Sequence, residues 1–322
     1  MTTGTDTLTA LATRARLAID LGKTSCRVRV VIGDHDVFNC EGPGAPGFAD
    51  FDGRQLALHA IENALFTVPA PILNSIDCIG IGAAGVDANR ESARYVAAQL
   101  SSTLNAPAAV MTDVLIAHIG ALGGRPGAVL VVGTGAVAYG LDAGGALSRT
   151  DGWGIWLGDD GSGRWIGQEG LKSVLRASDG RGAATSLTAA AAEVAGSLDR
   201  LPTYVSGTGQ PGRVLASFAP VVIAHADAGD AVASAIVAQA VELLTETATA
   251  VANPDDAVCV LGGLMNSPML AKRLLHSLAA QRLRITRPSA DALTGAAMIA
   301  FRTDLPHERY AIRVQPNEEP RL

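Results

Sequence analysis

The chain has 322 residues, of which 48% are apolar and 17% charged, and its formal net charge is −6. This length exceeds what a single hydrophobic core usually serves, and the composition excludes a disordered chain, so we expect two folded domains. The acidic balance and the lack of a basic stripe argue against a nucleic-acid partner.

Cysteine usage and the N-terminal sequence bear on the cellular compartment. The four cysteines are scattered without CxxC spacing inside apolar runs, which favours reduced core thiols over a disulfide framework or a metal site. The opening MTTGTDTLTALATRAR lacks the apolar core of a signal peptide, and no stretch offers about 18 uninterrupted apolar residues. We therefore expect a cytoplasmic protein without a membrane segment.

Three short strands open the predicted fold after the polar N-terminal tail. They are RLAID at 16–20, CRVRVVI at 26–32 and VFNCEG at 37–42, and the turn GKTS joins the first two. Arg27 and Arg29 alternate with valines, as in a half-buried strand. A loop rich in Gly and Pro follows at 42–53.

Helices and strands then alternate, which favours an α/β sheet covered by helices. The predicted helices are 54–66, 91–103 and 114–122, and the predicted strands are 77–82 and 108–112. A second cycle repeats the opening pattern with strand 127–132, the turn GTG and strand 136–142. We place the domain boundary near residue 114, giving domains 1–114 and 115–322.

The remainder of the chain is predicted to be mainly helical. Its longest helix covers 229–252, and Asp230 can cap that helix by accepting hydrogen bonds from its first-turn amides. Strands at 257–261 and 283–286 alternate with helices at 266–281 and 289–302, and the last helix is expected to pack toward the N-terminal domain. The last twenty residues, with prolines and mixed charge, are expected to be peripheral.

The first motif with chemical meaning is AIDLGKTSCR. An aspartate at a strand end, followed by Gly-Lys-Thr-Ser, suits a phosphate and its Mg²⁺: turn amides and hydroxyls face phosphate oxygens, and Asp20 holds the metal through water. A strand follows instead of a helix, so this is not a Walker A loop. The alternative is an ordinary β-turn in which Asp20 is hydrogen-bonded locally.

The second motif is VVGTGAVAYG, which fits the GxGxxA form of the dinucleotide fingerprint. That interpretation needs a helix after the glycines, whereas AVAYGLD alternates like a strand. A second phosphate-binding turn fits better than a dehydrogenase site.

Asp113 stands between a predicted strand and a predicted helix. Its position suits a helix N-cap, and its chemistry suits a general base that accepts the proton of an attacking hydroxyl. Later, Gly262 and Gly263 follow a strand, where a flat group such as adenine could approach the backbone. Gly295 lies inside a predicted helix, which suggests close helix packing or ligand approach.

These pieces, in this order, resemble the actin, hexokinase and heat-shock chaperone ATPase superfamily. Within it, GWGIWLGDDGSGRWIG at 152–167 resembles the GWG…GDEGS…WI signature of N-acetylglucosamine kinases and BadF/BadG-type ATPases. The later run ASFAPVVIAHADAGDAVA and the closing P..DALTGA pattern are similar too, so the resemblance covers about residues 16 to 302. It implies a two-domain actin-like (ribonuclease H-like) α/β fold with nucleotide and sugar in the interdomain cleft.

The resemblance also implies roles for individual residues, with ATP and Mg²⁺ as cofactors. Asp20 would hold Mg²⁺ through water, and Asp113 would be the catalytic base. The first phosphate loop would be Gly22, Lys23 and Thr24, the second Gly133, Thr134 and Gly135, and Gly262 and Gly263 would border adenosine. The sugar would contact Gly152, Trp153, Gly154 and Asp159.

Other residues of the 151–167 segment are given structural roles. Asp160 and Ser162 are expected to fix the turn into a helix that starts near Gly163, and Trp156 and Trp165 to pack the loop against the core. Departures from the family pattern are Lys23 at a usual glycine, Val137 near a usual polar residue, Asp160 at a usual Glu, and the lack of the usual asparagine in the loop at 42–53.

The expected function is therefore ATP-dependent phosphorylation of an amino sugar such as N-acetylglucosamine or glucosamine, at its 6-hydroxyl, by a protein that the resemblance implies is a homodimer. One alternative is an ATP-driven activator of radical dehydratases, against which the dispersed cysteines argue. A sugar-responsive transcriptional regulator would need a helix-turn-helix segment ahead of the core. The third alternative is a non-catalytic sugar-binding protein on the same fold.

Overall fold

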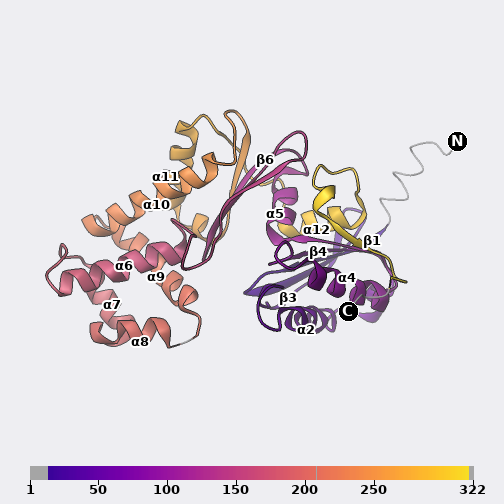
Figure 1. Cartoon of the computed structure of the whole chain (residues 1–322), viewed down its shortest axis with the longest axis horizontal. Helices are drawn as coiled ribbons and strands as arrows, with labels where there is room; N and C mark the ends of the chain where they lie inside the picture. The colour runs from indigo at the N-terminus through magenta and orange to yellow at the C-terminus, as the bar shows by residue number, and fades with distance from the viewer. Residues whose placement is uncertain (1–13, 208, 319–322) are drawn as a thin grey trace. The chain divides into compact units, whose positions relative to one another are not determined.

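The computed structural model describes residues 14–207 and 209–318, so most of the predicted N-terminal tail lies outside the described residues. The chain divides into two compact units (Figure 1). Unit 1 comprises the chain up to Pro126, the short stretch Ala143–Gly145 and the segment from Pro288 onward; unit 2 comprises Gly127–Asp142 and Ala146–Arg287.

Unit 1 is built on a six-stranded sheet with the order β11-β5-β4-β1-β2-β3. Strands β1 (Ala15–Leu21), β2 (Ser25–Ile32) and β3 (His35–Pro43) form an antiparallel meander, as predicted. Strands β4 (Ile76–Ala83) and β5 (Ala108–Thr112) run parallel to β1. The carboxyl ends of these parallel strands therefore meet at one edge, which is where ligands bind in open α/β sheets.

Helices cover both faces of this sheet (Figure 1). One face carries α2 (Gly53–Leu65) and α4 (Arg90–Leu104), with the short α3 (Ala70–Leu73) between them in the chain, and the other face carries α5 (Asp113–Leu122) and α12 (Ala292–Phe301). A Cβ at Gly295 of α12 would overlap the Ile116 carbonyl oxygen of α5. Close helix packing, one of the two explanations considered, therefore accounts for this glycine.

The C-terminal segment is part of the unit 1 core. Strand β11 (Ile312–Val314) pairs antiparallel with β5, and both Ile312 and Val314 are buried. The prediction of a peripheral C-terminus is wrong for this segment, because a three-residue strand carries too little periodicity to stand out among prolines and charges.

Unit 2 repeats the strand pattern of unit 1 in a five-stranded sheet with the order β10-β9-β6-β7-β8. Strands β6 (Gly127–Val132), β7 (Ala136–Leu141) and β8 (Leu147–Asp151) form an antiparallel meander. Strands β9 (Ala257–Leu261) and β10 (Arg284–Ile285) run parallel to β6. Sequence reasoning missed β8, whose residues LSRTD lack the apolar alternation of the other strands.

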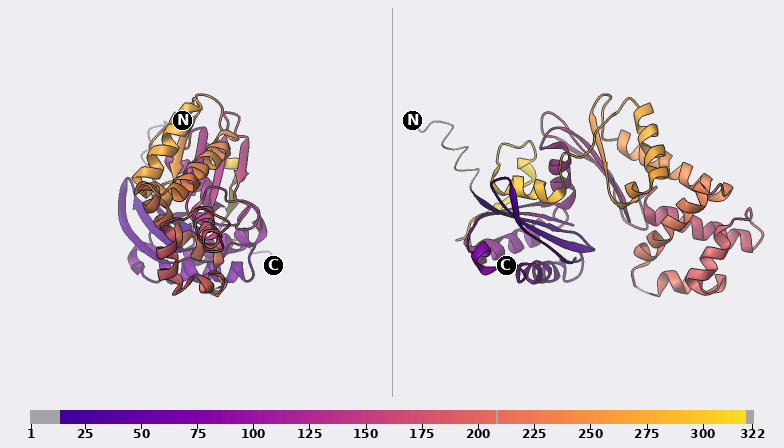
Figure 2. Two further views of the ribbon diagram at one scale, coloured as in Figure 1. Left: turned by 90° about the vertical axis from the view of Figure 1, so that its left-hand side faces the viewer. Right: turned by 180° about the vertical axis from the view of Figure 1, so that it is seen from behind.

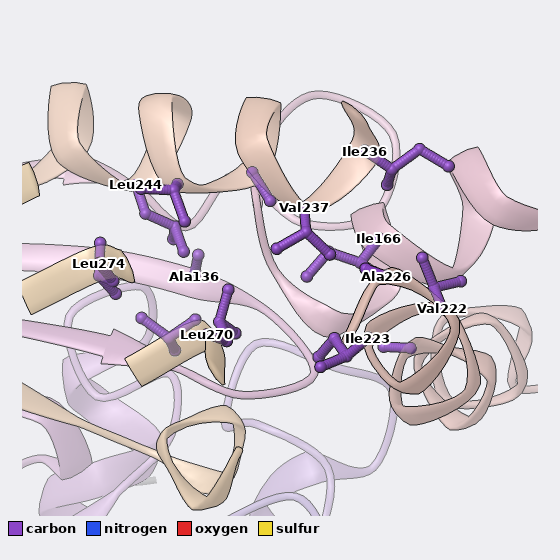
Figure 3. Packing of buried hydrophobic residues seen from close by; sticks show 14 of the residues in the cluster. Ala136, Ile166, Val222, Ile223, Ala226, Ile236, Val237, Leu244, Leu270 and Leu274 are labelled. Carbon is purple, nitrogen blue, oxygen red and sulfur yellow. The ribbon is translucent and has the colours of Figure 1, made fainter. Parts of the chain in front are cut away.

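The helices of unit 2 supply most of its core. They are α6 (Gly163–Ser178), α7 (Leu187–Ala195), α8 (Leu201–Ser206), α9 (Pro211–Asp227), α10 (Ala231–Thr249) and α11 (Pro268–Ala280). Figure 2 shows α6 to α10 gathered on one side of the sheet. Ile166, Val222, Val237 and Leu244 interdigitate with Ala136 of β7 and with Leu270 of α11 in one buried cluster (Figure 3).

Helix α10 is the one described helix long and apolar enough to cross a membrane by length and composition. Half of its apolar stretch is buried in the protein, and Val237, Ala240 and Leu244 belong to the unit 2 core. Its apolar character is therefore that of a core helix.

Asp230 caps α10, as predicted, and joins it to α7. Its carboxylate accepts hydrogen bonds from the amides of Ala233 (2.9 Å) and Ser186 (2.7 Å) and from the hydroxyls of Ser186 and Thr185. Partial burial opposes ionisation, but these donors outweigh it and lower the pKa of Asp230 to about 2.

Replacing Asp230 with Ala should lower the free energy of unfolding by about 1–2 kcal/mol at neutral pH, since a cap and its cross-links are lost. Because the folded-state pKa is depressed, this contribution is present above the unfolded pKa of about 4 and is lost as pH falls toward 2. Urea unfolding of Asp230→Ala and wild type between pH 7 and pH 2 measures it. The control Asp230→Asn keeps a capping oxygen; equal pH dependence in wild type and Asp230→Asn would contradict the assignment.

Candidate active site

Asp20 lies near the carboxyl end of β1 and is only 7% exposed. The β1–β2 register places it opposite Arg27, whose guanidinium forms an ion pair with the Asp20 carboxylate. Burial raises the pKa of Asp20, and the Arg27 charge and hydrogen bond partly offset this effect. Asp20 is therefore hydrogen-bonded locally, as in the alternative of an ordinary β-turn. Its second carboxylate oxygen has no bond to Arg27.

The turn after Asp20 is a tight one that the following loop supports. The Gly22 amide donates to the Ser25 carbonyl (2.9 Å), and the Gly44 amide donates to the Thr24 carbonyl (3.0 Å). The amides of Lys23 and Thr24 donate to no acceptor in the described part of the chain, so they are available to an anion. The exposed Lys23 ammonium forms an ion pair at 3.6 Å with Asp50, which lies in the loop at 42–53.

Gly44 is a residue of this site that sequence reasoning missed. A Cβ there would overlap the Gly22 carbonyl oxygen and lie 2.5 Å from the Ser25 amide nitrogen. The loop at 42–53 therefore packs directly on the first turn, and its glycine content has a steric cause.

Asp113 is the first residue of α5, directly after β5. Thr112, not Asp113, occupies the N-cap position, so the capping interpretation of Asp113 is wrong. The Asp113 carboxylate accepts hydrogen bonds from the Val114 amide (3.0 Å) and the Thr112 hydroxyl (3.1 Å). These bonds fix its side chain at the carboxyl edge of the unit 1 sheet.

Two features raise the pKa of Asp113: burial of the carboxyl first, and the negative charge of Asp20 second. The bonds from Thr112 and Val114 act in the opposite direction. Strand β4 separates β1 from β5 in the sheet, so Asp20 and Asp113 lie at the same edge two strands apart. A carboxyl with a raised pKa is suited to proton transfer near neutral pH.

The second turn, Gly133-Thr134-Gly135, connects β6 to β7 in unit 2. The Gly133 amide donates to the Gly135 carbonyl (2.9 Å), and the first amides of α6 donate to the carbonyls of Gly133 (2.9 Å) and Thr134 (3.0 Å). The amides of Thr134 and Gly135 donate to no acceptor among the described residues. Since a strand follows the glycines, the dinucleotide-fold alternative is excluded, and the turn presents free amides to an anion.

Gly262 and Gly263 follow β9 and have different roles. Gly262 has φ of 108° and a Cβ there would overlap the Val132 carbonyl, so the backbone itself requires glycine. Gly263 has no atom within 4 Å of a built Cβ and lines a cavity of about 980 Å³. The other walls come from α9, including Pro220 and Ile223, and from the start of α11, including Met269. This volume suits a cofactor-sized ligand.

The segment 151–160 forms a loop rich in left-handed backbone. Gly152 (φ 73°) and Gly154 (φ 86°) both need glycine, and Asp159 adopts φ of 60°. Trp153 is 66% exposed, with the Arg149 guanidinium 4.9 Å from its ring centroid. The Asp159 carboxylate accepts a hydrogen bond from the Ala136 amide (3.2 Å), directly after the second turn. Unit 2 thus brings the predicted sugar-binding loop and the predicted second phosphate loop together.

The packing prediction for the tryptophans is half correct. Trp165 packs against the unit 2 core, whereas Trp156 is 82% exposed, so the prediction for Trp156 is wrong. Ser162 caps α6 by accepting from the Trp165 amide (3.2 Å), as predicted. Asp160 contributes its backbone amide, which donates to Asp151 (2.8 Å).

Comparison with known proteins decides the family. The model of the BadF/BadG/BcrA/BcrD ATPase family matches residues 17–300. The chain belongs to this ATPase family. The family and the fold class predicted from the motifs are therefore confirmed.

Among its relatives, this BadF/BadG-type chain is similar to the N-acetylmuramic acid/N-acetylglucosamine kinase of Clostridium acetobutylicum, with 28% identity over 71% of this chain and 78% of the relative. Its structure is similar to a chain of Chromobacterium violaceum assigned to the N-acetylglucosamine kinases (28% identity, TM-score 0.70, covering 90% of this chain and 99% of that one). A chain of Porphyromonas gingivalis with the same assignment shares the fold at 18% identity and a TM-score of 0.72, covering 88% and 97% of the two chains.

The cysteines of this BadF/BadG-type ATPase are free thiols. Cys26, Cys78 and Cys259 are buried, and burial raises their pKa values to about 12, 11 and 11, which keeps them protonated and unreactive. Residues 14–207 and 209–318 contain no group of three or more His, Cys, Asp or Glu side chains placed to hold a metal ion.

Proposed function

We propose that the protein is an ATP-dependent sugar kinase that phosphorylates the 6-hydroxyl of an amino sugar such as N-acetylglucosamine or glucosamine. The observation that carries the proposal is the half-buried Asp113 carboxylate, held by two hydrogen bonds at the carboxyl edge of the unit 1 sheet. The sugar-kinase names of the relatives support the reaction class. The two units would act as the two kinase domains.

Asp113 would act as the general base. Phosphoryl transfer to an alcohol needs a group that orients the hydroxyl and accepts its proton as the oxygen attacks the γ-phosphorus. The raised pKa of the Asp113 carboxyl lies closer to neutral pH than that of an ordinary aspartate, which makes the ionised carboxylate a stronger base. The proton passes from the sugar hydroxyl to Asp113, and the γ-phosphoryl group passes from ATP to the sugar oxygen, with ADP as the leaving group.

Phosphate oxygens would be bound by the two turns. The free amides of Lys23 and Thr24 in unit 1, and of Thr134 and Gly135 in unit 2, offer the donors that anion-binding turns require. The Lys23 ammonium would add positive charge.

The fold implies Mg²⁺, and the residues present fit a water-mediated site. Mg²⁺ usually keeps several waters and takes one or two carboxylates plus substrate phosphates, so a three-ligand protein cage is not needed. The Asp20 oxygen that Arg27 leaves unpaired can accept from a metal-bound water. Bound Mg²⁺ would neutralise charge on the phosphates, while Arg27 holds Asp20 in place.

The sugar would contact the 152–159 loop. The backbone at Gly152 and Gly154 allows close approach, Trp153 offers an exposed apolar ring, and the Asp159 carboxylate can accept from a hydroxyl or amide of the sugar. We further propose that the protein acts in the cytoplasm as a homodimer, without nucleic-acid or membrane partners. Light scattering on the purified chain tests the dimer.

We assign adenosine to the cavity lined by Gly263, with Gly262 shaping the backbone beside it. Gly263→Val would fill cavity space without a clash, so the KM for ATP should rise roughly tenfold, equivalent to about 1.4 kcal/mol. The melting temperature and the KM for the sugar should stay near wild type.

Gly42→Val is the matched control for this variant. It adds the same side chain to strand β3 of unit 1, where a built Cβ also meets no atom within 4 Å. An unchanged KM for ATP in Gly263→Val, or an equal rise in Gly42→Val, would contradict the assignment of the cavity to adenosine.

A further inference from the structure

Asp151 is a strained and buried residue to which the sequence pattern gave no role. Its φ is 62°, a left-handed conformation that costs a non-glycine residue about 1 kcal/mol or more. The other described non-glycine residues with positive φ are exposed or half-buried, whereas Asp151 is 9% exposed. Such strain persists only where surrounding contacts determine the conformation, and it concentrates at functional sites.

The carboxylate of Asp151 binds the backbone on both sides of Asp159. One carboxylate oxygen accepts from the Asp159 amide (2.7 Å), and the other accepts from the Asp160 amide (2.8 Å). A Cβ at Gly158 would overlap the first of these oxygens, so glycine at 158 is what lets the carboxylate reach the turn.

Arg164, on the first turn of α6, holds the other ends of the same two peptide groups. Its guanidinium donates to the carbonyl of Gly158 and to the carbonyl of Asp159 (3.3 Å), and it is 5% exposed. The peptide group before Asp159 is thus held by Arg164 at its oxygen and by Asp151 at its nitrogen. The peptide group after Asp159 is held in the same way.

These hydrogen bonds to the two flanking peptide groups fix both backbone dihedral angles of Asp159. Since Asp159 itself adopts φ of 60°, its conformation is not one that an aspartate favours unaided. Fixing it directs the carboxylate to the Ala136 amide beside the second turn. We infer that Asp151 and Arg164 form a clamp of positioning residues that preorganises Asp159 for the sugar, an inference that rests on the proposed function.

Arg149 supports the same loop from the neighbouring strand β8. Its guanidinium donates to the carbonyls of Asp151 (3.1 Å) and Gly152 (2.6 Å) and lies against the Trp153 ring. The loop is therefore held before it meets a ligand, and preorganisation of this kind raises affinity by lowering the entropy cost of binding.

Asp151→Asn tests the clamp because the amide side chain has one acceptor oxygen and cannot accept from both backbone amides. We expect the KM for the sugar to rise roughly tenfold while the KM for ATP stays within about twofold of wild type. Amide hydrogen exchange at Asp159 and Asp160, measured without substrate, should accelerate. Asp151→Gly removes the strain and both hydrogen bonds, so it should show the same kinetic pattern in a chain that folds.

The matched control is Asp255→Gly, which replaces an exposed aspartate of unit 2 at φ 69°. It should leave both KM values and the exchange at 159–160 unchanged. Slow exchange retained at Asp159 and Asp160 in both Asp151 variants would overturn the clamp, as would a sugar KM equal to that of wild type. A wild-type protein that phosphorylates no sugar would instead contradict the proposed function, and the exchange measurement would still decide whether the clamp exists.

Discussion

Asp113→Asn is expected to lower kcat for sugar phosphorylation by about a thousandfold, the scale of a lost general base. The amide cannot accept the hydroxyl proton, yet it can keep the hydrogen bonds from Val114 and Thr112. The Kd for ATP should therefore change little. Isothermal titration with ATP and a coupled ADP-release assay on the same preparation measure the two quantities.

Asp34→Asn is the control for this prediction, because Asp34 is an exposed aspartate of the β2–β3 turn. It should retain wild-type turnover. In wild type, the rate should fall on the acidic side at a pH above the ordinary aspartate range, since the base must be ionised and its pKa is raised. Near-normal turnover by Asp113→Asn would contradict the role of Asp113.

Gly44→Ala is expected to damage the first phosphate turn. The added methyl group cannot fit between the Gly22 carbonyl and the Ser25 amide, so the loop or the turn must move. Overpacking of this kind costs about 1–3 kcal/mol of stability. The KM for ATP should rise roughly tenfold, because the free amides of Lys23 and Thr24 lose their positions.

Gly42→Ala provides the comparison two residues away in the same chain segment. A built Cβ at position 42 meets no atom within 4 Å, so this variant should match wild type in thermal unfolding and kinetics. If Gly44→Ala unfolds at the wild-type temperature with an unchanged KM for ATP, the loop at 42–53 does not support the first turn.

Sequence reasoning was most successful where a pattern repeats at short range. The strands β1, β2 and β4 to β7 lie where apolar runs and Gly turns predicted them. Burial of a strand face produces a pattern of apolar residues that can be recognised in the local sequence. The GKTS turn also implies one contact that was not predicted. A tight hairpin there places Asp20 opposite Arg27, so their ion pair could have been predicted from the register.

Features that depend on contacts distant in sequence were missed. Strand β11 is defined by its pairing with β5, about two hundred residues earlier, and nothing local identifies it. Gly44 is explained only by the turn at Gly22 that it touches. The clamp at Asp159 likewise needs Asp151 and Arg164 on opposite sides of one loop, an arrangement that residue spacing does not encode.

Trp156 and Asp113 show the limits of residue-type preferences. A tryptophan in a glycine-rich loop was expected to pack inward, yet Trp156 is 82% exposed. The position of Asp113 between a strand and a helix also suited an N-cap, yet the structure gives that position to Thr112. In both cases the residue type alone did not determine where the side chain lies.

The central claim, ATP-dependent phosphorylation of an amino sugar, is tested most directly by a coupled ADP-release assay with Mg²⁺. The acceptors would be N-acetylglucosamine, glucosamine, N-acetylmuramic acid, N-acetylmannosamine and glucose, with Asp113→Asn as the blank and mass spectrometry of the product. We predict ADP release that depends on an amino sugar, accompanied by a sugar 6-phosphate. ADP release at the same rate with and without every sugar, or no release above the Asp113→Asn blank, would contradict the account.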